Sequence, residues 1–396
     1  MNRRRPHLAA RLCRPFAAVF AVLALGGCSS LNPFASDEPK PAPLAEFSPQ
    51  ASLRVAARLD VDDNERSVVM TPAVARDAVY VAGATGEAGK LEDGRVVWEK
   101  DLDLKLNAGV GTDGRLLAVV TSRGQLLALD ASDGAERWRV DVGAEVLDVP
   151  IVSEEYVVVR ASDSRLFAFS AVDGERKWTY QRGTPALVVR SQTGMTLVED
   201  KLIVAAYPGG KLVGILIDTG APVWELALAA PRGVTELERI SDVVGEPVFV
   251  APEICAVAFQ GKLGCFDLRD GHSTWARDFS SITGLDRAGR LLVATHENNT
   301  VQAFNAEDGS PLWQQKALRN RKVSRPLIVG RYVVVGDVQG YVHLLENDSG
   351  EFAARAKTDG SPIVAPPRRV DDSHFVVQTE EGGVFVFAIG SAGSDS

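Results

Sequence analysis

One short motif recurs along this chain and restricts its fold more than any other feature. In each complete copy a glycine closes a polar turn, and a tryptophan follows four residues later. Successive tryptophans are 40, 40, 46, 51 and 38 residues apart, and no tryptophan lies outside the motif. A period of roughly 20–50 residues indicates a solenoid or a propeller. The copies end at Trp98, Trp138, Trp178, Trp224, Trp275 and Trp313, and a seventh has Ala354 in the tryptophan position.

The residues that precede each tryptophan predict strands and not helices. In the second unit two apolar runs, 115–120 and 125–130, are joined by a turn at Gly124. Because the runs are apolar on both faces, we expect each sheet to be covered on both sides. The segment after each tryptophan, such as 146–152, is expected to begin the next sheet. Four short strands in each unit of roughly 40–45 residues are typical of a β-propeller.

The number of units predicts an all-β, eight-bladed propeller. Six units carry a tryptophan, one carries Ala354, and a partial unit covers 374–378 and 384–388. That last unit has no outer strand after it, whereas 52–59 forms an unpaired strand at the beginning. We expect this first strand to complete the last blade, because closing the ring leaves no sheet edge unpaired. The predicted propeller covers 51–390, and a short tail covers 391–396.

The first 27 residues are predicted to be a lipoprotein signal peptide. Five arginines precede an apolar run of ten residues, 16–25, which is too short to span a bilayer. The run ends in Leu-Gly-Gly-Cys, which resembles a bacterial lipobox with Cys28 as the lipidated residue. The alternative is an ordinary signal peptide with an unrelated cysteine. Ser29 follows the cysteine and favours the outer membrane, because lipoproteins retained in the inner membrane usually have aspartate there.

Residues 28–50 are expected to be a tether between the lipid and the propeller. Five prolines lie among small and charged residues, a composition that favours an extended and semi-flexible chain. Removing residues 1–27 removes five arginines and no acid, so the formal net charge falls from −9 to −14. Such an acidic protein is expected to bind nucleic acid poorly.

Cys255 and Cys265 are the two cysteines that remain in the predicted propeller. A turn at Gln260-Gly261 predicts a hairpin in which they lie nearly opposite each other. A disulfide is therefore possible in an oxidising periplasm, and two buried thiols are the alternative.

The sequence indicates no catalytic residues, no metal ligands and no cofactor. Its histidines are scattered, and no phosphate-binding loop or nucleophile elbow is present. Asp-Gly pairs suit turns, because aspartate stabilises a turn and glycine accepts positive φ, so the repeated acids are interpreted as structural. The repeated tryptophan is interpreted as a packing element.

The repeat 128–138 resembles that of pyrroloquinoline-quinone dehydrogenases, which are eight-bladed propellers with tryptophan-docking motifs. Those enzymes also carry adjacent cysteines and an acidic set around calcium and the cofactor. This sequence has no adjacent cysteines and lacks the long insertions that build such a site. A quinone-dependent dehydrogenase remains as one alternative function, and a periplasmic module that binds another ligand is a second.

The whole chain resembles the BamB family, lipoproteins of the outer-membrane β-barrel assembly machinery. The resemblance rests on the lipobox, the proline-rich tether, the eight repeats and three segments, 237–243, 263–275 and 335–341. It implies a non-enzymatic scaffold in the outer membrane that binds the periplasmic domains of BamA and works with the other lipoproteins of the complex.

The two longest tryptophan spacings place extra residues in two connections between blades, about 181–196 and 229–248. Insertions in repeat proteins gather in loops, often on the binding face. The family pattern implies BamA contacts at Leu187, Val189 and Arg190 in the first connection, where Val189 replaces the family's leucine, and at Asp242 in the second. The alternative is that the first stretch only begins a strand and the charges form a solvated loop.

Overall fold

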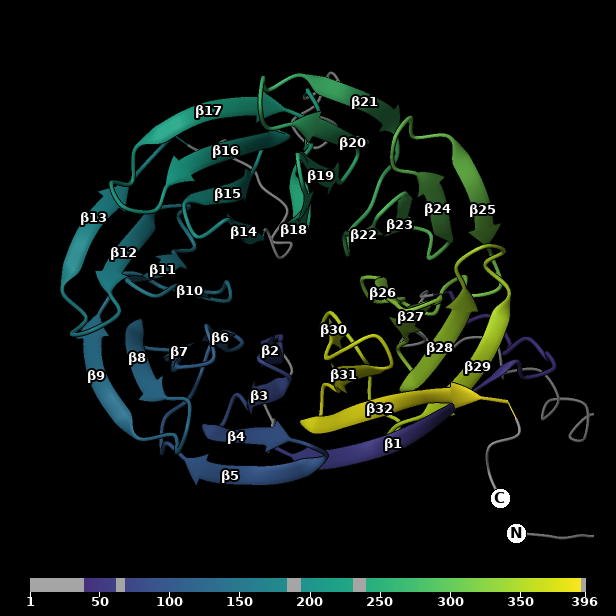
Figure 1. Ribbon diagram of the computed structural model, residues 1–396, viewed down its shortest axis with the longest axis horizontal. Helices are drawn as coiled ribbons and strands as arrows, with labels where there is room; N and C mark the ends of the chain where they lie inside the picture. The colour runs from purple at the N-terminus through teal and green to yellow at the C-terminus, as the bar shows by residue number, and fades with distance from the viewer. Residues whose placement is uncertain (1–38, 62–67, 184–193, 231–239, 393–396) are drawn as a thin grey trace, which may run out of the picture. The chain divides into compact units, whose positions relative to one another are not determined.

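The computed structural model describes residues 39–61, 68–183, 194–230 and 240–392. The chain divides into two compact units, residues 1–40 and 41–396, and the fold described here is that of the second. In the described part of this unit, 32 strands form eight antiparallel sheets of four strands, arranged as blades around a ring (Figure 1). The structure confirms the predicted eight-bladed propeller. Among the described residues no helix is long and apolar enough to cross a membrane.

The first four blades follow one another along the chain. They consist of β2 (Ala73–Ala75), β3 (Ala78–Ala82), β4 (Glu87–Glu92) and β5 (Arg95–Asp101); β6 (Gly111–Thr112), β7 (Leu116–Val120), β8 (Gln125–Asp130) and β9 (Glu136–Asp141); β10 (Ile151–Val152), β11 (Tyr156–Arg160), β12 (Leu166–Ser170) and β13 (Arg176–Tyr180); and β14 (Met195–Val198), β15 (Leu202–Tyr207), β16 (Lys211–Leu216) and β17 (Pro222–Ala227).

The last four blades continue this order, and the eighth takes its outer strand from the beginning of the chain. They consist of β18 (Val243–Val250), β19 (Glu253–Ala258), β20 (Lys262–Asp267) and β21 (Ser273–Asp278); β22 (Leu285–Ala288), β23 (Leu291–Thr295), β24 (Val301–Asn305) and β25 (Pro311–Gln315); β26 (Leu327–Val329), β27 (Tyr332–Gly336), β28 (Tyr341–Glu346) and β29 (Phe352–Lys357); and β30 (Arg368–Arg369), β31 (His374–Gln378), β32 (Gly383–Ser391) and β1 (Ala51–Asp60).

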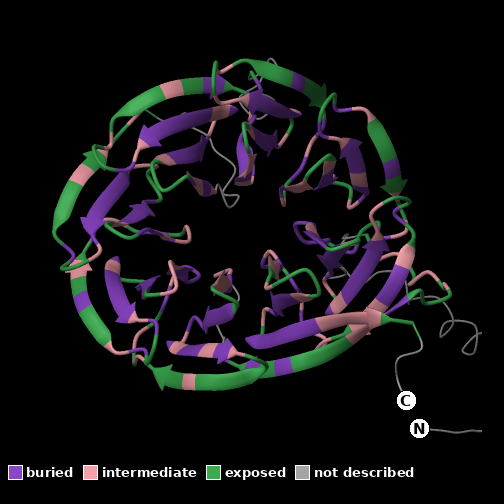
Figure 2. Ribbon diagram, in the orientation of Figure 1, coloured by how far each residue is buried: buried purple, intermediate pink, exposed green. Residues whose placement is uncertain are grey.

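The hydrophobic core is divided among the seams between blades. The second and third strands of the blades are almost wholly buried, whereas most residues of the fourth, outermost strand are exposed in the first six blades (Figure 2). Eight clusters of buried side chains each join two neighbouring blades, so every blade contributes to two of them. The apolar pattern on both faces of the inner strands follows from this packing.

Five of the six tryptophans dock on the next blade. The indole of Trp138, for example, lies against Gly174, and its Nε1 donates to the carbonyl oxygen of Ala171 at 2.9 Å. Gly174 has φ +74°, and a Cβ atom there would meet the indole at 2.7 Å, so this turn requires glycine on both counts. The same Nε1 bond joins Trp98, Trp178, Trp275 and Trp313 to the following blade.

Trp224 and Ala354 depart from this docking pattern for different reasons. The ring of Trp224 lies over Gly214 of its own sheet, and Leu226 faces the glycine of the next turn, Gly271. Ala354 faces blade 8, whose third and fourth strands, β32 and β1, come from opposite ends of the chain. No connecting turn exists there for a tryptophan to cover, which explains the substitution.

A segment that we call the strap, residues 42–50, packs on blade 7 beside Ala354 (purple beside β29 in Figure 1). The ring of Phe47 stacks on Phe352 with 5.5 Å between centroids, and the amide of Gln50 donates to the Ala353 carbonyl at 2.9 Å. The sequence predicts a tether as far as residue 50. The structure instead attaches its last nine residues to the propeller.

Candidate interaction face

The direction of the strands divides the connections between two faces of the ring. In a four-stranded antiparallel blade, the link to the next blade and the turn between the second and third strands lie on one face, which we call the loop face. The two other turns lie on the opposite face, which we call the turn face. The connections β13–β14 and β17–β18 belong to the loop face. The first connection contains Leu187, Val189 and Arg190, which lie outside the described residues. Cys28, near the N-terminus, also lies outside them.

The ends of both long connections meet at an irregularity in β18. The pairing of β18 with β19 shifts between Val244 and Val248. The amide of Gly194 donates to the carbonyl of Gly245 at 3.0 Å, and the hydroxyl of Thr196 donates to the carbonyl of Pro247. Gly194, at the end of the first long connection, is therefore attached to the bulge in β18. The second long connection leads into the same bulge.

Glu246 projects from this bulge and joins distant blades across the centre of the ring. One carboxylate oxygen accepts from Arg325 at 2.8 Å and from Arg368 at 2.6 Å, and the other accepts a second bond from Arg368. These arginines precede β26 and begin β30, so the cluster links blade 5 to blades 7 and 8. Burial opposes ionisation of Glu246, but the charges and hydrogen bonds of the two arginines hold its pKa below its usual value.

Asp242 does not lie where the family resemblance implied. Its side chain is buried, with 1% of the residue exposed, and its Oδ1 accepts from the amide of Gly209 at 3.0 Å. Its carbonyl accepts from the amide of Phe259 at 2.8 Å. The expected surface contact is therefore replaced by a structural one, which ties the end of the β17–β18 connection to a turn of blade 4.

Among the described residues of the loop face, three large apolar side chains are exposed, and our interpretation of the sequence missed them. Leu147, Ile282 and Val364 are 43%, 49% and 47% exposed and occupy corresponding positions in three connections between blades. Each follows a residue that is completely buried, so a comparison of the connections with one another could have found them. They extend the apolar surface of this face beyond the two long connections.

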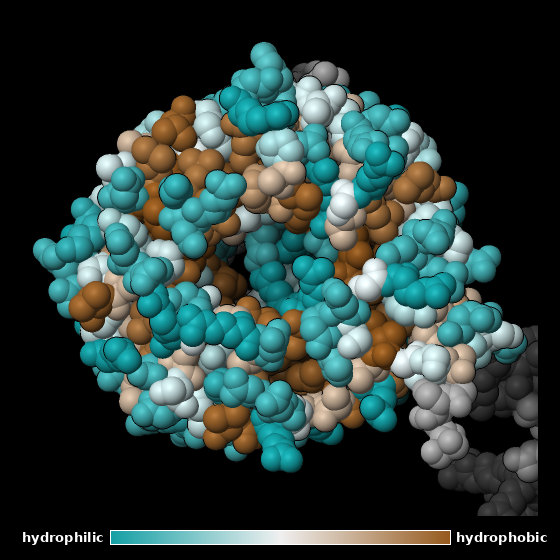
Figure 3. Space-filling model, viewed as in Figure 1, coloured by the Kyte–Doolittle hydropathy of each residue, from teal (hydrophilic) through white to brown (hydrophobic). Residues whose placement is uncertain are grey.

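The centre of the ring contains a cavity of about 230 Å³. Figure 3 shows the ring hollowed there, with hydrophilic side chains in the hollow. The charged residues among its lining are Asp148, Glu246, Arg325 and Arg368, and each of them has a partner: Asp148 accepts from Arg160, and Glu246 binds both of the other arginines. Within the described ranges no group of three His, Cys, Asp or Glu residues could hold a metal ion.

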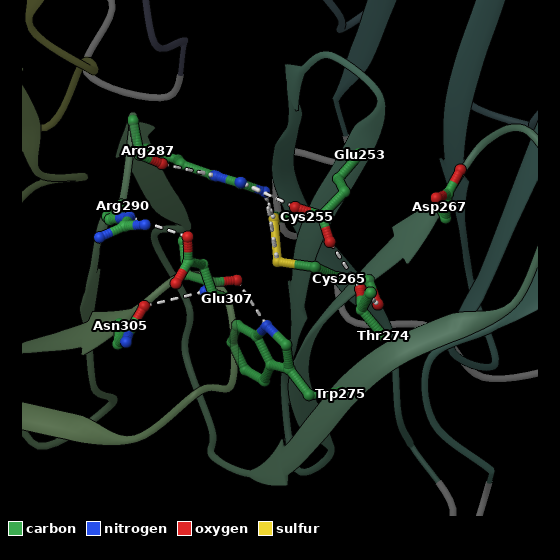
Figure 4. A network of polar contacts seen from close by, with 12 residues as sticks. Glu253, Cys255, Cys265, Asp267, Thr274, Trp275, Arg287, Arg290, Asn305 and Glu307 are labelled. Atoms are coloured by element: carbon green, nitrogen blue, oxygen red, sulfur yellow. Dashed lines mark hydrogen bonds and ion pairs between the residues drawn. A yellow bond between two sulfur atoms is a disulfide. The ribbon is translucent and has the colours of Figure 1, made fainter.

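Cys255 and Cys265 are joined by a disulfide, with an S–S distance of 2.02 Å (Figure 4). They are directly opposite each other in β19 and β20, and both are fully buried. Arg287 lies over them, with Nη1 3.1 Å from the sulfur of Cys255, and its Nη2 pairs with Glu253 at 2.8 Å. The hairpin predicted from the turn at Gln260-Gly261 thus brings both cysteines together inside blade 5.

The fold and its docking motif define an eight-bladed β-propeller of the tryptophan-docked type. The family model described as "Outer membrane protein assembly factor BamB" matches residues 87–315 and 297–393. A relative of that name from Burkholderia pseudomallei is 39% identical over 383 residues, which cover 96% of this chain and 99% of the relative. The chain belongs to the BamB family.

Solved structures agree with this assignment. The crystal structure of BamB from Moraxella catarrhalis superposes with a TM-score of 0.77 at 25% identity and covers 85% of this chain and all of that one. Quinohemoprotein alcohol dehydrogenase from Comamonas testosteroni has a TM-score of 0.63 at 15% identity, covering 85% of this chain and 76% of the enzyme. The second likeness shows a shared fold and nothing more.

Proposed function

We propose that this chain is an outer-membrane lipoprotein that acts as a scaffold in β-barrel protein assembly by binding the periplasmic domains of BamA. The observation that carries the proposal is the nearly full-length similarity to proteins named as outer membrane assembly factors. The loop face supports it, because two extended connections and three exposed apolar side chains lie there. Other lipoproteins of the same complex are further expected partners.

Capture of the tagged protein from solubilised outer membranes tests this function. We expect a BamA-type barrel protein to be recovered with it at a constant ratio, and the other lipoproteins of the complex in smaller amounts. Recovery of the folded protein without any barrel protein would contradict the proposal.

The contacts are expected in the β13–β14 connection. Leu187 and Val189 alternate along it, so in an extended segment they share one side and form an apolar anchor beside Arg190. Asp242 is not included, because its carboxylate is buried against Gly209.

Replacing Leu187 by aspartate, or Arg190 by glutamate, is expected to weaken binding of the BamA periplasmic domains. Loss of a hot spot costs about 2 kcal/mol or more, which is roughly a thirtyfold higher Kd. Titration calorimetry of the purified proteins would measure this change.

Val172→Asp is the matched control for these variants. Val172 is 82% exposed, but it lies in the turn between β12 and β13 on the turn face. Unchanged affinity of the double variant Leu187→Asp/Arg190→Glu, with a normal circular dichroism spectrum, would place the interface elsewhere on the ring.

Lipidation is expected at Cys28 and anchors the protein to the periplasmic face of the outer membrane. Cys28→Ala should leave an unprocessed or soluble protein, whereas Cys13→Ala should have no effect, because residue 13 belongs to the signal peptide that is removed. Fractionation of membranes on a density gradient measures both outcomes. Normal sedimentation of the Cys28 variant with the outer membrane would rule out this anchor.

We also infer that the chain is not an enzyme. Each charged side chain that lines the central cavity is engaged in an ion pair, so these residues do not present a free set of charged groups to a bound quinone. Saturable oxidation of an alcohol or sugar by the purified protein with pyrroloquinoline quinone and calcium would contradict this inference.

A further inference from the structure

The first strand of the propeller begins on the turn face. Ala51 pairs with Ser391, and Asp60 pairs with Gly383, so β1 runs antiparallel to β32. Gly383 follows the turn between β31 and β32, which is a loop-face turn. The opposite end of the pair, where Ala51 lies, is therefore at the turn face. A chain that left the ring directly before β1 would leave it from that face.

The strap carries the chain back across the outer wall of blade 7. At one end, Gln50 bonds to Ala353 near the start of β29, which follows a turn-face turn. At the other end, the amide of Ala42 donates to the carbonyl of Arg319 at 3.0 Å. Arg319 lies in the connection between β25 and β26, which belongs to the loop face. The strap thus moves the exit of the chain from one face to the other.

Buried groups of blade 7 bind the backbone of the strap. The side chain of Arg321 is only 2% exposed, and its Nη1 donates to the carbonyl of Ala42 at 2.6 Å. Its Nε donates to Asp337 at 2.7 Å, and the carboxylate of Asp337 is fully buried. Its Nη2 donates to Gln339 of the same blade at 2.7 Å, so the guanidinium is held by the blade while Nη1 reaches the strap.

A second arginine binds the middle of the strap. Arg355 donates to the carbonyl of Ala45 at 3.1 Å and lies 5.0 Å from the ring centroid of Phe47. It also donates to Nδ1 of His343 at 3.1 Å, and Nε2 of His343 lies 2.8 Å from Asp337. Burial lowers the pKa of His343, so the neutral ring accepts from Arg355 and donates to Asp337. One network in the blade therefore holds the strap at Ala42 and at Ala45.

We propose that the strap turns the loop face of the propeller toward the membrane. This inference rests on the proposed lipid anchor at Cys28. The chain from Cys28 to Pro41 has 12 intervening residues and can span at most about 45 Å, so the exit point on the loop face of blade 7 stays within that distance of the lipid. The loop face, with its long connections, then faces the bilayer in which a β-barrel partner is embedded.

The position of the exit within the ring adds to this arrangement. The strap lies beside β29 of blade 7 (Figure 1), and its exit is at the connection between blades 6 and 7, where Ala42 bonds to Arg319. The exit and the β13–β14 connection, which holds Leu187, therefore share one face but are separated by blades 4, 5 and 6.

The test is fluorescence quenching on vesicles by a lipid that carries a quencher. The mature lipidated protein, reconstituted in phosphatidylethanolamine and phosphatidylglycerol, is labelled at Asn298→Cys or at Glu307→Cys. Both residues are exposed and lie on blade 6, beside the strap, but in a loop-face turn and a turn-face turn, respectively. Strands of five or six residues are roughly 17–20 Å long, so we expect quenching at residue 298 to be about twofold stronger or more.

A variant confined to the strap shows whether the strap causes the orientation. Ala42→Pro/Phe47→Ala removes the amide donor and the aromatic ring but leaves Arg321, Arg355 and blade 7 unchanged. The quenching ratio is expected to fall toward one in this variant, with the fold preserved by circular dichroism. Equal quenching at the two sites in the parent protein, or the same ratio in the strap variant, would overturn the proposal.

Flotation of the vesicles separates this inference from the proposed function. Protein that floats with the vesicles but shows no preference between faces contradicts the strap and leaves the anchor intact. Protein that does not float at all contradicts the lipid anchor and, with it, the orientation inferred here. Loss of BamA binding on substitution of Leu187 is measured separately and does not depend on either result.

Discussion

Replacement of Trp138 by alanine is expected to lower the free energy of unfolding by about 3–5 kcal/mol, the usual cost of removing a buried aromatic side chain. Only 8% of Trp138 is exposed, and the indole closes the seam between blades 2 and 3. Its Nε1 also satisfies the carbonyl of Ala171, which would lose this partner. Unfolding of the mature protein in urea, followed by circular dichroism, measures the change.

Trp224→Ala is the matched control for the docking effect. Its indole is half-buried and lies against Gly214 within blade 4. The contact with Gly271 of the next blade is made by Leu226 and stays in place when the indole is removed. We expect a clearly smaller loss of stability than for Trp138→Ala. Equal losses would show that the tryptophans act by their size alone and not by docking on the neighbouring blade.

Glu246→Gln is expected to destabilise the ring by about 2–4 kcal/mol at neutral pH, because it leaves two arginines without their carboxylate. The side chains of Arg325 and Arg368 are 10% and 23% exposed, so water replaces the lost partner only in part. Glu307→Gln removes one carboxylate from a surface pair whose side chains are 82% and 54% exposed. This control should change stability by less than about 0.5 kcal/mol.

The effect of Glu246 should depend on pH in a definite direction. Its pKa in the folded protein lies below that of the unfolded chain, which is roughly 4.3. Its stabilisation is therefore complete above that pH and is lost as the pH falls toward the folded-state pKa. The difference between the parent protein and Glu246→Gln in urea unfolding should shrink between about pH 5 and pH 3. A difference that stays constant over this range would mean that the charge of Glu246 is not responsible.

The sequence predicted the closure of the ring and the place of its irregularities. The strand expected at 52–59 is β1, and it completes blade 8. The missing tryptophan at Ala354 falls at the seam where the two ends of the chain meet. Both could be inferred because a repeat makes departures from the pattern visible.

The candidate site was less accessible to sequence reasoning. Asp242 was assigned to the binding face because the family pattern implied a contact there, yet its carboxylate caps the amide of Gly209 on another blade. Glu246 lies four residues further on and was not singled out. Its partners, Arg325 and Arg368, are 79 and 122 residues away, and no local pattern joins them.

By itself, the sequence determined what repeats: the number of blades, the direction of their strands, the docking tryptophans and the family. These properties depend on the short-range alternation of apolar residues and turns, which each unit repeats. Only the tertiary structure decided which charges meet across the channel, that Asp242 is buried, and that residues 42–50 return along blade 7. Those contacts form between residues that become neighbours only when the ring closes. The sequence of a single repeat therefore contains no pattern that predicts them.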